Sequence, residues 1–484
     1  MARIIVHGHF YQPPRENPWT GDIDKQPSAA PFRDWNERVH AECYLNMVFA
    51  DLEGPAGELV VNNFERISFN VGPTLASWME RLHPRTYARI LKADRKSVER
   101  LGRGNAMAQS FHHTILPLSK DRDVRTEIRW GLADFRHRFG REPEGMWLPE
   151  TAVNDEVLGA LIDEGVGFTI LAPHQARRWR TLVPHPGNWS DDPVDTRLSY
   201  RWAHPDGSGR TITLFFYDGE IAQRIAFGNP MSSGSDFLDL FESRSEADHH
   251  VVHAATDGET YGHHQTFGEI GLAYALFVAA ESRSTEITNY AAHLERFPPT
   301  HEVQIVPGEG TSWSCSHGVG RWKENCGCST RAEDGWNQEW RSPLREAMTV
   351  VEAAADDIFD RLGGAALANP WGARDRYVDV VIGKRSLDEF LIDEAAGDDR
   401  HQAATLLELQ RNAMAMFTSC GWFFADIADI ETVQILRYAA RTLELMDELG
   451  EIAPYKEFLR ILEQAKSNDP EQGTGADVFR SIRH

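Results

Sequence analysis

The stretch that decides the fold is residues 145–171, GMWLPETAVNDEVLGALIDEGVGFTIL. It begins with a short apolar run, Gly145 to Leu148, that has the length of a buried strand. Apolar residues then recur at helical spacing from Glu156 to Asp163, and two glycines end the pattern before a second apolar run, Phe168 to Leu171. The stretch is therefore predicted to form a strand, a helix and a strand, the unit that builds parallel sheets.

The same alternation of strand-type and helix-type segments extends through the first 300 residues. The predicted strands are residues 4–8, 66–70, 106–111, 145–148, 168–171, 212–217 and 251–255. These units predict an α/β fold, either a barrel or an open parallel sheet. From residue 341 the pattern is helical, as in 431–449, where apolar residues recur at helical spacing. We therefore expect a catalytic domain at 1–300, a connector rich in Cys and Trp at 301–340, an α-helical domain at 341–466 and a flexible tail at 467–484.

Composition excludes several classes of protein. The 484 residues are 41% hydrophobic and 25% charged, as in soluble globular chains. With 50 basic and 73 acidic residues the net charge is -23, which would repel nucleic acid. The longest apolar stretch, Leu272 to Ala280, is about half the length of a membrane-spanning helix. We expect neither nucleic acid nor membrane as partner.

The first residues lack leader features and there are 5 cysteines, so we expect a cytoplasmic protein.

Polar residues gather where the predicted strands end, which in parallel βα folds is the edge that carries the active site. Glu150 and Asp257 follow two different strands, each among aromatic residues and histidines. A glycosidase needs two carboxyl groups, one to protonate the leaving oxygen and one to attack the anomeric carbon. The alternative for Glu150 is that it caps the next helix, a task that Thr151 or Asn154 could also perform.

Four ordered motifs together resemble glycoside hydrolase family 57. They are HGHFYQP at 7–13, GNAMAQSFHHTILPL at 104–118, WLPE at 147–150 and DGETYGH at 257–263. The resemblance implies a retaining enzyme on an incomplete (β/α)7 barrel followed by an α-helical domain. It implies Glu150 as nucleophile and Asp257 as acid/base. We expect Glu259, two residues past Asp257, to orient its neighbours, and the alternative is that Glu259 is itself the acid. Further residues implied to bind substrate are His7, His9, Gln12, His113, Trp147, Glu259 and His263.

The connector carries an unusual density of Cys, Trp, His and Arg. Cys315, Cys326 and Cys328 could bind a structural zinc ion with His317 as fourth ligand, form a disulfide, or remain buried thiols; their spacing is not that of a standard zinc knuckle. An alternative role for Trp313, Arg321 and Trp322 is to form the wall of a glycan groove. The segment resembles a subgroup of the family without a well-defined activity.

In the helical domain, small residues and aromatics interrupt an apolar helix at 418–424. This pattern is typical of a helix kink. It also resembles the family's short motif that reaches into the barrel cleft, although Gly421 replaces the usual Asp. Trp422 is therefore a candidate contact to substrate.

The expected function is hydrolysis or transglycosylation of α-1,4-linked glucans, of amylase or 4-α-glucanotransferase type, through a covalent glycosyl intermediate on Glu150. The partner is an α-glucan or malto-oligosaccharide, and we expect neither cofactor nor catalytic metal. A branching transferase is an alternative within this chemistry. Rival hypotheses are a metal-dependent deacetylase or mannosidase-like hydrolase with His7, His9 and Asp257 as ligands, and a non-catalytic glycan-binding protein. The sequence determines neither linkage preference nor oligomeric state.

Overall fold

The computed structural model describes residues 2–54, 57–331, 335–397 and 399–482, and it divides into two compact units. The barrel unit comprises Met1–Gln12, Lys25–Gln109 and Arg138–Gly308. The helical unit comprises Pro13–Asp24, Ser110–His137 and Glu309–His484. The units are therefore interleaved along the chain, whereas the sequence predicted consecutive domains. Long-range contacts decide this grouping, and no local pattern reports them.

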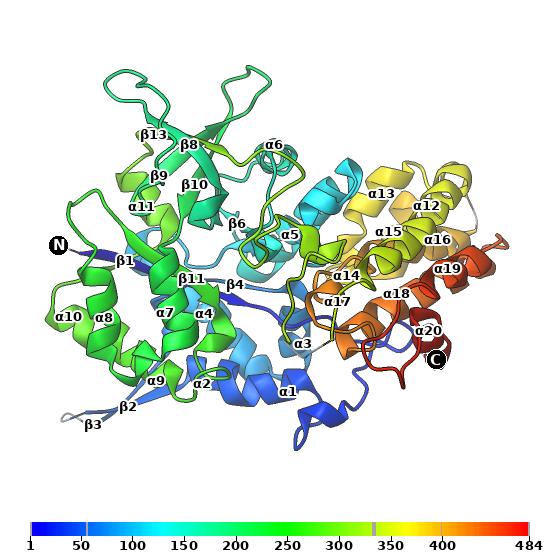
Figure 1. The fold of residues 1–484 in the computed structure, drawn as a ribbon, viewed down its shortest axis with the longest axis horizontal. Helices are drawn as coiled ribbons and strands as arrows, with labels where there is room; N and C mark the ends of the chain where they lie inside the picture. The colour runs from blue at the N-terminus through cyan, green and yellow to red at the C-terminus, as the bar shows by residue number, and fades with distance from the viewer. Residues whose placement is uncertain (1, 55–56, 332–334, 398, 483–484) are drawn as a thin grey trace. The chain divides into compact units, whose positions relative to one another are not determined.

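The barrel unit is built on seven parallel strands (Figure 1). Its central strand β1 pairs in parallel with both β11 and β4, and β5 pairs with β6 as β7 does with β10. Single bridges, Phe69 to Ala106 and Gly145 to Phe168, join these pairs. The strands are β1 (Arg3–Phe10), β4 (Ser68–Val71), β5 (Ala108–Gln109), β6 (Met146–Trp147), β7 (Phe168–Leu171), β10 (Thr211–Phe216) and β11 (Val252–Asp257).

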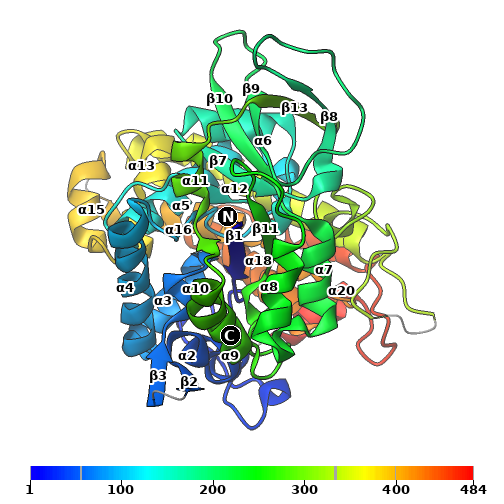
Figure 2. The same cartoon turned by 90° about the vertical axis from the view of Figure 1, so that its left-hand side faces the viewer.

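The ring of strands closes loosely between β10 and β11. There the Asp218 amide donates a hydrogen bond to the His253 carbonyl at 2.8 Å, just beyond the end of β10. The arrangement is the expected incomplete (β/α)7 barrel, and each predicted strand coincides with one of its strands. In Figure 2 the N-terminal end of β1 faces the viewer, with α3 (Pro73–Leu82) and α4 (Pro84–Leu101) on one side and α7 (Gly219–Gly228) and α8 (Gly234–Glu242) on the other.

The helix of the deciding stretch is α6 (Asp155–Asp163). The Val157 amide donates to the side chain of Asn154, which caps the helix, and Val157, Leu158 and Leu161 are buried. The cap is thus Asn154 and not Glu150. The other helices of the unit are α1 (Trp35–Val39), α2 (Leu45–Val48), α9 (Gly268–Tyr274), α10 (Ala280–Ser282) and α11 (Tyr290–Arg296).

Sequence patterns did not predict the remaining strands of the barrel unit. One reason is visible in β8, whose sequence ARRWRT has no apolar run, because tertiary pairing with β13 stabilises it. The strands are β2 (Ala50–Gly54), β3 (Gly57–Val61), β8 (Ala176–Thr181), β9 (Ser199–Ala203), β12 (Glu286–Ile287) and β13 (His301–Ile305).

The helical unit is organised around its long helices, which Figure 1 shows in yellow to red. Helix α12 packs on α16 and α18, and buried Arg374 of α13 donates to Asp123, Gln410 and Thr126. Its helices are most of α5 (Asp121–Phe139), then α12 (Arg341–Ala366), α13 (Pro370–Arg376), α14 (Val378–Val381), α15 (Leu387–Glu394), α16 (Arg400–Ala415), α17 (Cys420–Phe423), α18 (Ile430–Glu448), α19 (Tyr455–Leu462) and α20 (Gly475–Ser481). In the described part of the chain, no helix has both the length and the apolarity needed to cross a membrane.

The C-terminal segment is not the loose tail that its polar composition predicted. Helix α20 begins after Thr474, whose side chain and that of Asp477 cap the helix reciprocally, and Ala476 and Val478 are buried. The capping box and the buried face stabilise a helix where composition alone suggested disorder. The last two residues of the predicted tail, 483–484, lie outside the described residues.

Candidate active site

Glu150 lies in a strained turn directly after β6. It has φ 57° and ψ 17°, and Thr151 also has a positive φ of 51°. Two consecutive non-glycine residues in the left-handed region cost about 1–2 kcal/mol each, so the surroundings must hold the turn in place. Gln175 does this: the Thr151 hydroxyl donates to its Oε1 at 2.9 Å, and its Nε2 donates to the Thr151 carbonyl at 2.8 Å.

Asp257 is the last residue of β11 and is paired in register with His9 of β1. Its side chain is accessible to solvent, yet protein atoms surround it closely enough to raise its pKa from 3.8 to about 7. Burial is the larger cause of this rise, and the negative charge of Glu150 is the second. Two carboxyl groups from different strands therefore interact at the carboxyl-end edge of the barrel. One of them is an acid suited to proton transfer at neutral pH.

A hydrogen-bond network fixes the two histidines of the first motif. The Asn70 amide donates to His9 Nδ1 at 2.8 Å, while Asn70 Oδ1 lies 3.2 Å from His7 Nε2. The Ser68 hydroxyl lies 3.0 Å from His7 Nδ1. This arrangement requires the proton of His7 on Nε2 and that of His9 on Nε2. Burial lowers the pKa of each histidine to about 3, so both rings are neutral at physiological pH.

Trp147 stacks on both of these imidazoles. Its ring centroid lies 4.9 Å from that of His7 and 5.1 Å from that of His9, and all three side chains are buried. Since both nitrogens of His7 are bonded within the barrel, His7 orients Asn70 and through it His9. Direct contact of these three residues with a sugar remains a prediction.

Glu259 anchors the segment that follows β1. The Tyr44 hydroxyl donates to Glu259 Oε1 at 2.5 Å, and the Tyr11 amide donates to the same oxygen at 3.1 Å. Gln12 in turn donates to the Tyr44 hydroxyl at 3.2 Å. Burial is the main reason that the pKa of Glu259 rises to about 8. Glu259 and Gln12 are thus buried residues that hold their neighbours.

His263 lies in the loop after the η8 turn (Gly258–Thr260). Its Nδ1 is 2.5 Å from Glu42 Oε2, and the ring meets Trp35 edge-on. Its predicted contact with substrate is untested by this geometry.

Four predicted site residues belong to the helical unit. His113 has φ 57° and its Nδ1 lies 2.6 Å from the Ser419 hydroxyl. Arg321 donates to the Ser314 carbonyl at 3.2 Å, and its guanidinium lies 4.1 Å from the centroid of the Phe423 ring. Trp313 is half-buried, and Trp422 is fully buried and stacked on Phe417. Their contact with substrate remains a prediction.

Sequence reasoning missed three residues that support the site: Asn70, Tyr44 and Gln175. Asn70 carried a usable signal, because it is a polar residue in a predicted buried strand and must find partners there. Gln175 follows the strand at 168–171 but has no motif around it. Tyr44 lies in a helical segment without any pattern that points to the barrel edge.

Metal-binding capacity lies elsewhere in the described residues. The only group of three or more His, Cys, Asp or Glu side chains close enough to share an ion there is Cys315, His317, Cys326 and Cys328. His7, His9 and Asp257 form no such group, so the rival hypothesis of a catalytic metal receives no support from geometry.

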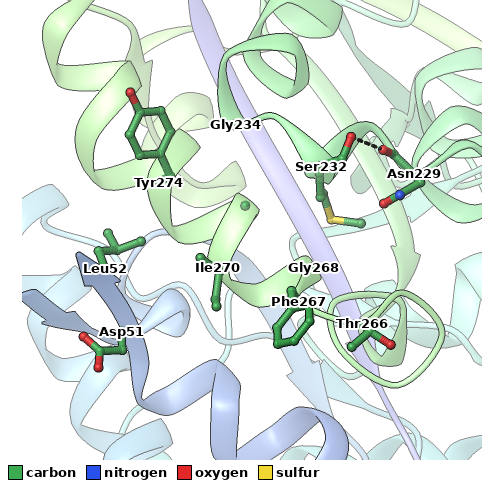
Figure 3. Close-up of a pocket in the computed structure, with 12 residues that line it drawn as sticks. Asp51, Leu52, Asn229, Ser232, Gly234, Thr266, Phe267, Gly268, Ile270 and Tyr274 are labelled. Carbon is green, nitrogen blue, oxygen red and sulfur yellow. Dashed lines mark hydrogen bonds between the residues drawn. The ribbon is translucent and has the colours of Figure 1, made fainter. Parts of the chain in front are cut away.

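A pocket of about 770 Å³ is also separate from the two carboxylates (Figure 3). Several of its residues come from β2, η7 (Pro230–Ser232) and α9. It is lined by Asp51, Leu52, Asn229, Met231, Ser232, Gly234, Thr266, Phe267, Gly268, Ile270, Gly271 and Tyr274. Because it contains none of the residues predicted for catalysis, its size does not make it the active site.

Comparison with known proteins supports the assignment of the fold. The exo-type maltose-forming amylase of Pyrococcus sp. ST04 is similar with a TM-score of 0.69 at 15% identity, over 100% of this chain and 88% of the other. The α-amylase AmyC of Thermotoga maritima has a TM-score of 0.58 at 14% identity, over 100% of both chains. At these identities the likeness shows a shared fold.

Sequence comparison gives more distant, partial relatives. An α-amylase of Pyrococcus abyssi (strain GE5 / Orsay) is 23% identical over 245 residues, 50% of this chain and 34% of its own length. A 4-α-glucanotransferase of Thermococcus litoralis is 23% identical over 256 residues, 51% of this chain and 35% of its own. The matched region is thus only about a third of the length of these relatives.

Two family profiles cover most of the sequence. Residues 336–483 match a domain of unknown function (DUF3536). Residues 35–306 match glycosyl hydrolase family 57, which is more than half of the chain and includes most of the barrel with Glu150 and Asp257. This chain therefore belongs to glycosyl hydrolase family 57.

Proposed function

We propose that this protein is a retaining enzyme that acts on α-1,4-linked glucans, with Glu150 as nucleophile and Asp257 as acid/base. The observation that carries the proposal is the interacting pair of carboxyl groups at the ends of β6 and β11, one of which has a pKa of about 7. The names of the relatives, α-amylase and 4-α-glucanotransferase, support the substrate class.

The proposed reaction has two steps. In the first, the Glu150 carboxylate attacks the anomeric carbon and forms an ester, while Asp257 gives its proton to the departing glycosidic oxygen. In the second, Asp257 takes a proton from water or from an acceptor hydroxyl, which attacks the same carbon and releases Glu150. Esterification removes the charge of Glu150, which lowers the pKa of Asp257 when it has to act as a base.

The surrounding residues position this pair in the proposed mechanism. Neutral His9 has its proton on Nε2 and would donate a hydrogen bond to a sugar hydroxyl, with Asn70 fixing its ring. Gln175 holds the strained turn that carries Glu150. Glu259 fixes the backbone at Tyr11 and is itself protonated near neutral pH, so it adds no further negative charge beside Asp257.

We propose an amylase or 4-α-glucanotransferase type of activity, in which water or a sugar 4-hydroxyl accepts the glycosyl group. Maltoheptaose distinguishes these outcomes. Purified wild type is expected to give shorter chains, or longer and shorter chains together if it transfers, by mass spectrometry. Nuclear magnetic resonance should show products in the α configuration, and new 1,6 linkages would identify a branching enzyme instead. We further propose a cytoplasmic location, which suits the low content of 5 cysteines in 484 residues.

Matched variants test the assigned roles. Glu150→Gln and Asp257→Asn should abolish turnover of maltoheptaose, whereas Glu156→Gln, an exposed carboxylate on α6, should leave it unchanged. With α-maltosyl fluoride and azide, Glu150→Gly should yield the β-glycosyl azide and Asp257→Ala the α-glycosyl azide, because azide attacks the substrate in one case and the glycosyl ester in the other. Turnover at the wild-type rate in both Glu150→Gln and Asp257→Asn would contradict the assignment. So would formation of the same azide anomer by Glu150→Gly and Asp257→Ala.

A further inference from the structure

The connector contains a long segment with little regular structure. Between Glu309 and Trp340 its only helical turn among the described residues is η10 (Gly320–Trp322), and residues 332–334 lie outside the description. Irregular segments longer than about 12–15 residues are uncommon inside compact domains, and they are usually either functional or disordered. Here Cys315 and Trp322 are buried, so the segment contributes to the interior of the helical unit.

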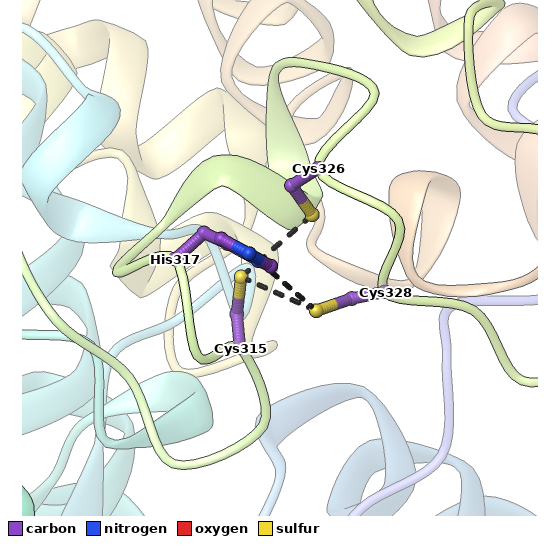
Figure 4. Close-up of side chains that lie close together, drawn as sticks. All are labelled: Cys315, His317, Cys326 and Cys328. Atoms are coloured by element: carbon purple, nitrogen blue, oxygen red, sulfur yellow. Dashed lines mark hydrogen bonds between the residues drawn. The ribbon is translucent and has the colours of Figure 1, made fainter.

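Three thiols and an imidazole of this segment converge on one point (Figure 4). Cys315 Sγ lies 3.8 Å from both Cys326 Sγ and Cys328 Sγ, and Cys328 Sγ lies 3.7 Å from His317 Nδ1. All four ligand atoms lie within 4.8 Å of one another. Residues separated by as many as thirteen positions in the chain therefore present their donor atoms to a shared centre.

These distances match one tetrahedral zinc ion. Zinc bonds of about 2.3 Å to sulfur and about 2.0 Å to nitrogen give tetrahedral edges of about 3.8 Å between sulfurs and about 3.5 Å between sulfur and nitrogen. A disulfide needs about 2.05 Å between sulfurs, and Cys315 is equally far from both candidate partners. In an iron–sulfur cluster the ligands are divided among two or more irons, so ligands on different irons lie farther apart than the edges of one tetrahedron.

We propose that Cys315, His317 through Nδ1, Cys326 and Cys328 bind one structural zinc ion. Four protein ligands complete the coordination of zinc and leave no open position for water or substrate, so the ion would hold the fold. Each thiol loses its proton to the solvent as it binds, and the imidazole binds in its neutral form. The four ligands include neither of the two carboxylates, so the site does not depend on the proposed function.

The surroundings of the cluster suit thiolate ligands. The backbone amides of His317 and Arg321 donate to Cys315 Sγ, and that of Ser316 donates to Cys328. Three thiolates and one zinc ion carry a net charge of about -1. The guanidinium group of Arg341, which is fully buried, interacts electrostatically with all three thiols. Its Nη1 donates a hydrogen bond to the Cys328 carbonyl at 2.9 Å.

Two features of the backbone and side chains allow this geometry. Gly327 has φ +83°, a conformation that lets the chain reverse between Cys326 and Cys328 so that both sulfurs face the same centre. The Ser316 hydroxyl lies 3.4 Å from His317 Nδ1, a weak contact that a zinc bond would replace. Because Cys315 and His317 precede Arg321 and Trp322 in the chain while Cys326 and Cys328 follow them, a zinc ion would join the two ends of the loop that carries Arg321 and Trp322.

The first test is the metal content of the purified full-length chain, produced with zinc in the medium and without chelators. Inductively coupled plasma mass spectrometry should find about one zinc ion per chain. X-ray absorption spectroscopy should show three sulfur atoms at about 2.3 Å and one nitrogen atom at about 2.0 Å from the zinc ion. Cys326→Ser and Cys328→Ser should reduce the bound zinc at least about tenfold. Cys420→Ser, which removes a thiol outside the cluster, should retain it.

Measurements on the wild type keep the test decisive if a variant fails to fold. Cobalt(II) exchanged into the site should give the intense visible bands of a tetrahedral centre and thiolate-to-metal charge transfer in the near ultraviolet. Wild type that stays free of zinc when reduced and supplied with zinc overturns the proposal. Bound zinc whose X-ray absorption spectrum shows no sulfur ligands also overturns it. The same holds if Cys326→Ser and Cys328→Ser retain as much zinc as wild type, or if the purified chain contains a stoichiometric iron–sulfur cluster.

Discussion

Neutralising Glu150 is expected to lower the pKa of Asp257, which tests directly whether the two carboxyl groups form a pair. Glu150→Gln keeps the shape of the side chain and removes its charge. Because a nearby negative charge disfavours ionisation of Asp257, its removal must favour ionisation. The substitution leaves the protein atoms that surround Asp257 in place, so the pKa should remain above the ordinary value of 3.8.

The size of the change is bounded by the structure. The pKa of Asp257 rises from 3.8 to about 7, and burial is the larger of the two causes. The charge of Glu150 therefore accounts for less than half of the rise, which is less than about 1.5 pH units. In Glu150→Gln we expect Asp257 to titrate about 1 pH unit lower than in wild type.

Infrared difference spectroscopy can follow this titration without substrate. The carboxyl band of Asp257 is identified by subtracting the spectra of proteins that also carry Asp257→Asn, and its pH dependence is compared between wild type and Glu150→Gln. The exposed control Glu156→Gln should leave the midpoint where it is. In wild type, kcat/KM should fall as the pH rises through about 7, because the acid loses its proton there.

An unchanged or higher midpoint in Glu150→Gln would refute the reasoning, since the charge of Glu150 would then not reach Asp257. A fall of the full amount, to about 3.8, would refute the claim that burial dominates.

Three further predictions concern residues that support the fold and the site. The pKa of buried Glu259 is raised from 4.5 to about 8, so its contribution to stability is complete below pH 4.5 and is lost as the pH rises through 8. Between pH 5 and pH 8 the Tm of Glu259→Gln should therefore fall less than that of wild type, and an equal fall in both proteins would contradict this. Gln175→Met should reduce kcat about 10- to 100-fold with little change in KM, because the turn of Glu150 loosens; a change confined to KM would contradict it. Arg374→Met leaves Asp123 buried without its cation and should destabilise the helical unit by about 3–5 kcal/mol in chemical denaturation, whereas Arg361→Met, at an exposed ion pair, should have little effect.

Local patterns were sufficient for the frame of the barrel. Runs such as Phe168–Leu171 are apolar enough to be strands, and the helix after Glu150 carries its own cap and glycine stops, so both could be predicted from neighbours in the chain. The position of Glu150 and Asp257 at strand ends followed from the same patterns, because parallel strands bring their carboxyl ends to one edge. The strands at β8 and β13 escaped prediction because their pairing with each other stabilises them.

The chemistry of the site was beyond the sequence for a physical reason. The pKa of Asp257, the proton positions on His7 and His9 and the clamp of Gln175 on Thr151 all depend on burial and on partners distant in the chain. The same holds for Cys315, Cys326 and Cys328: their spacing left zinc, a disulfide and free thiols open, and the zinc proposal rests on the 3.8 Å that separates Cys315 Sγ from each of the other two sulfurs. The sequence by itself determined the order of the seven barrel strands and the residues at their ends, since these depend on local periodicity. Only the tertiary structure decided the interleaving of the two units, the electrostatic environment of the carboxylates and the convergence of the four connector ligands, because distances between remote residues exist only in the folded chain.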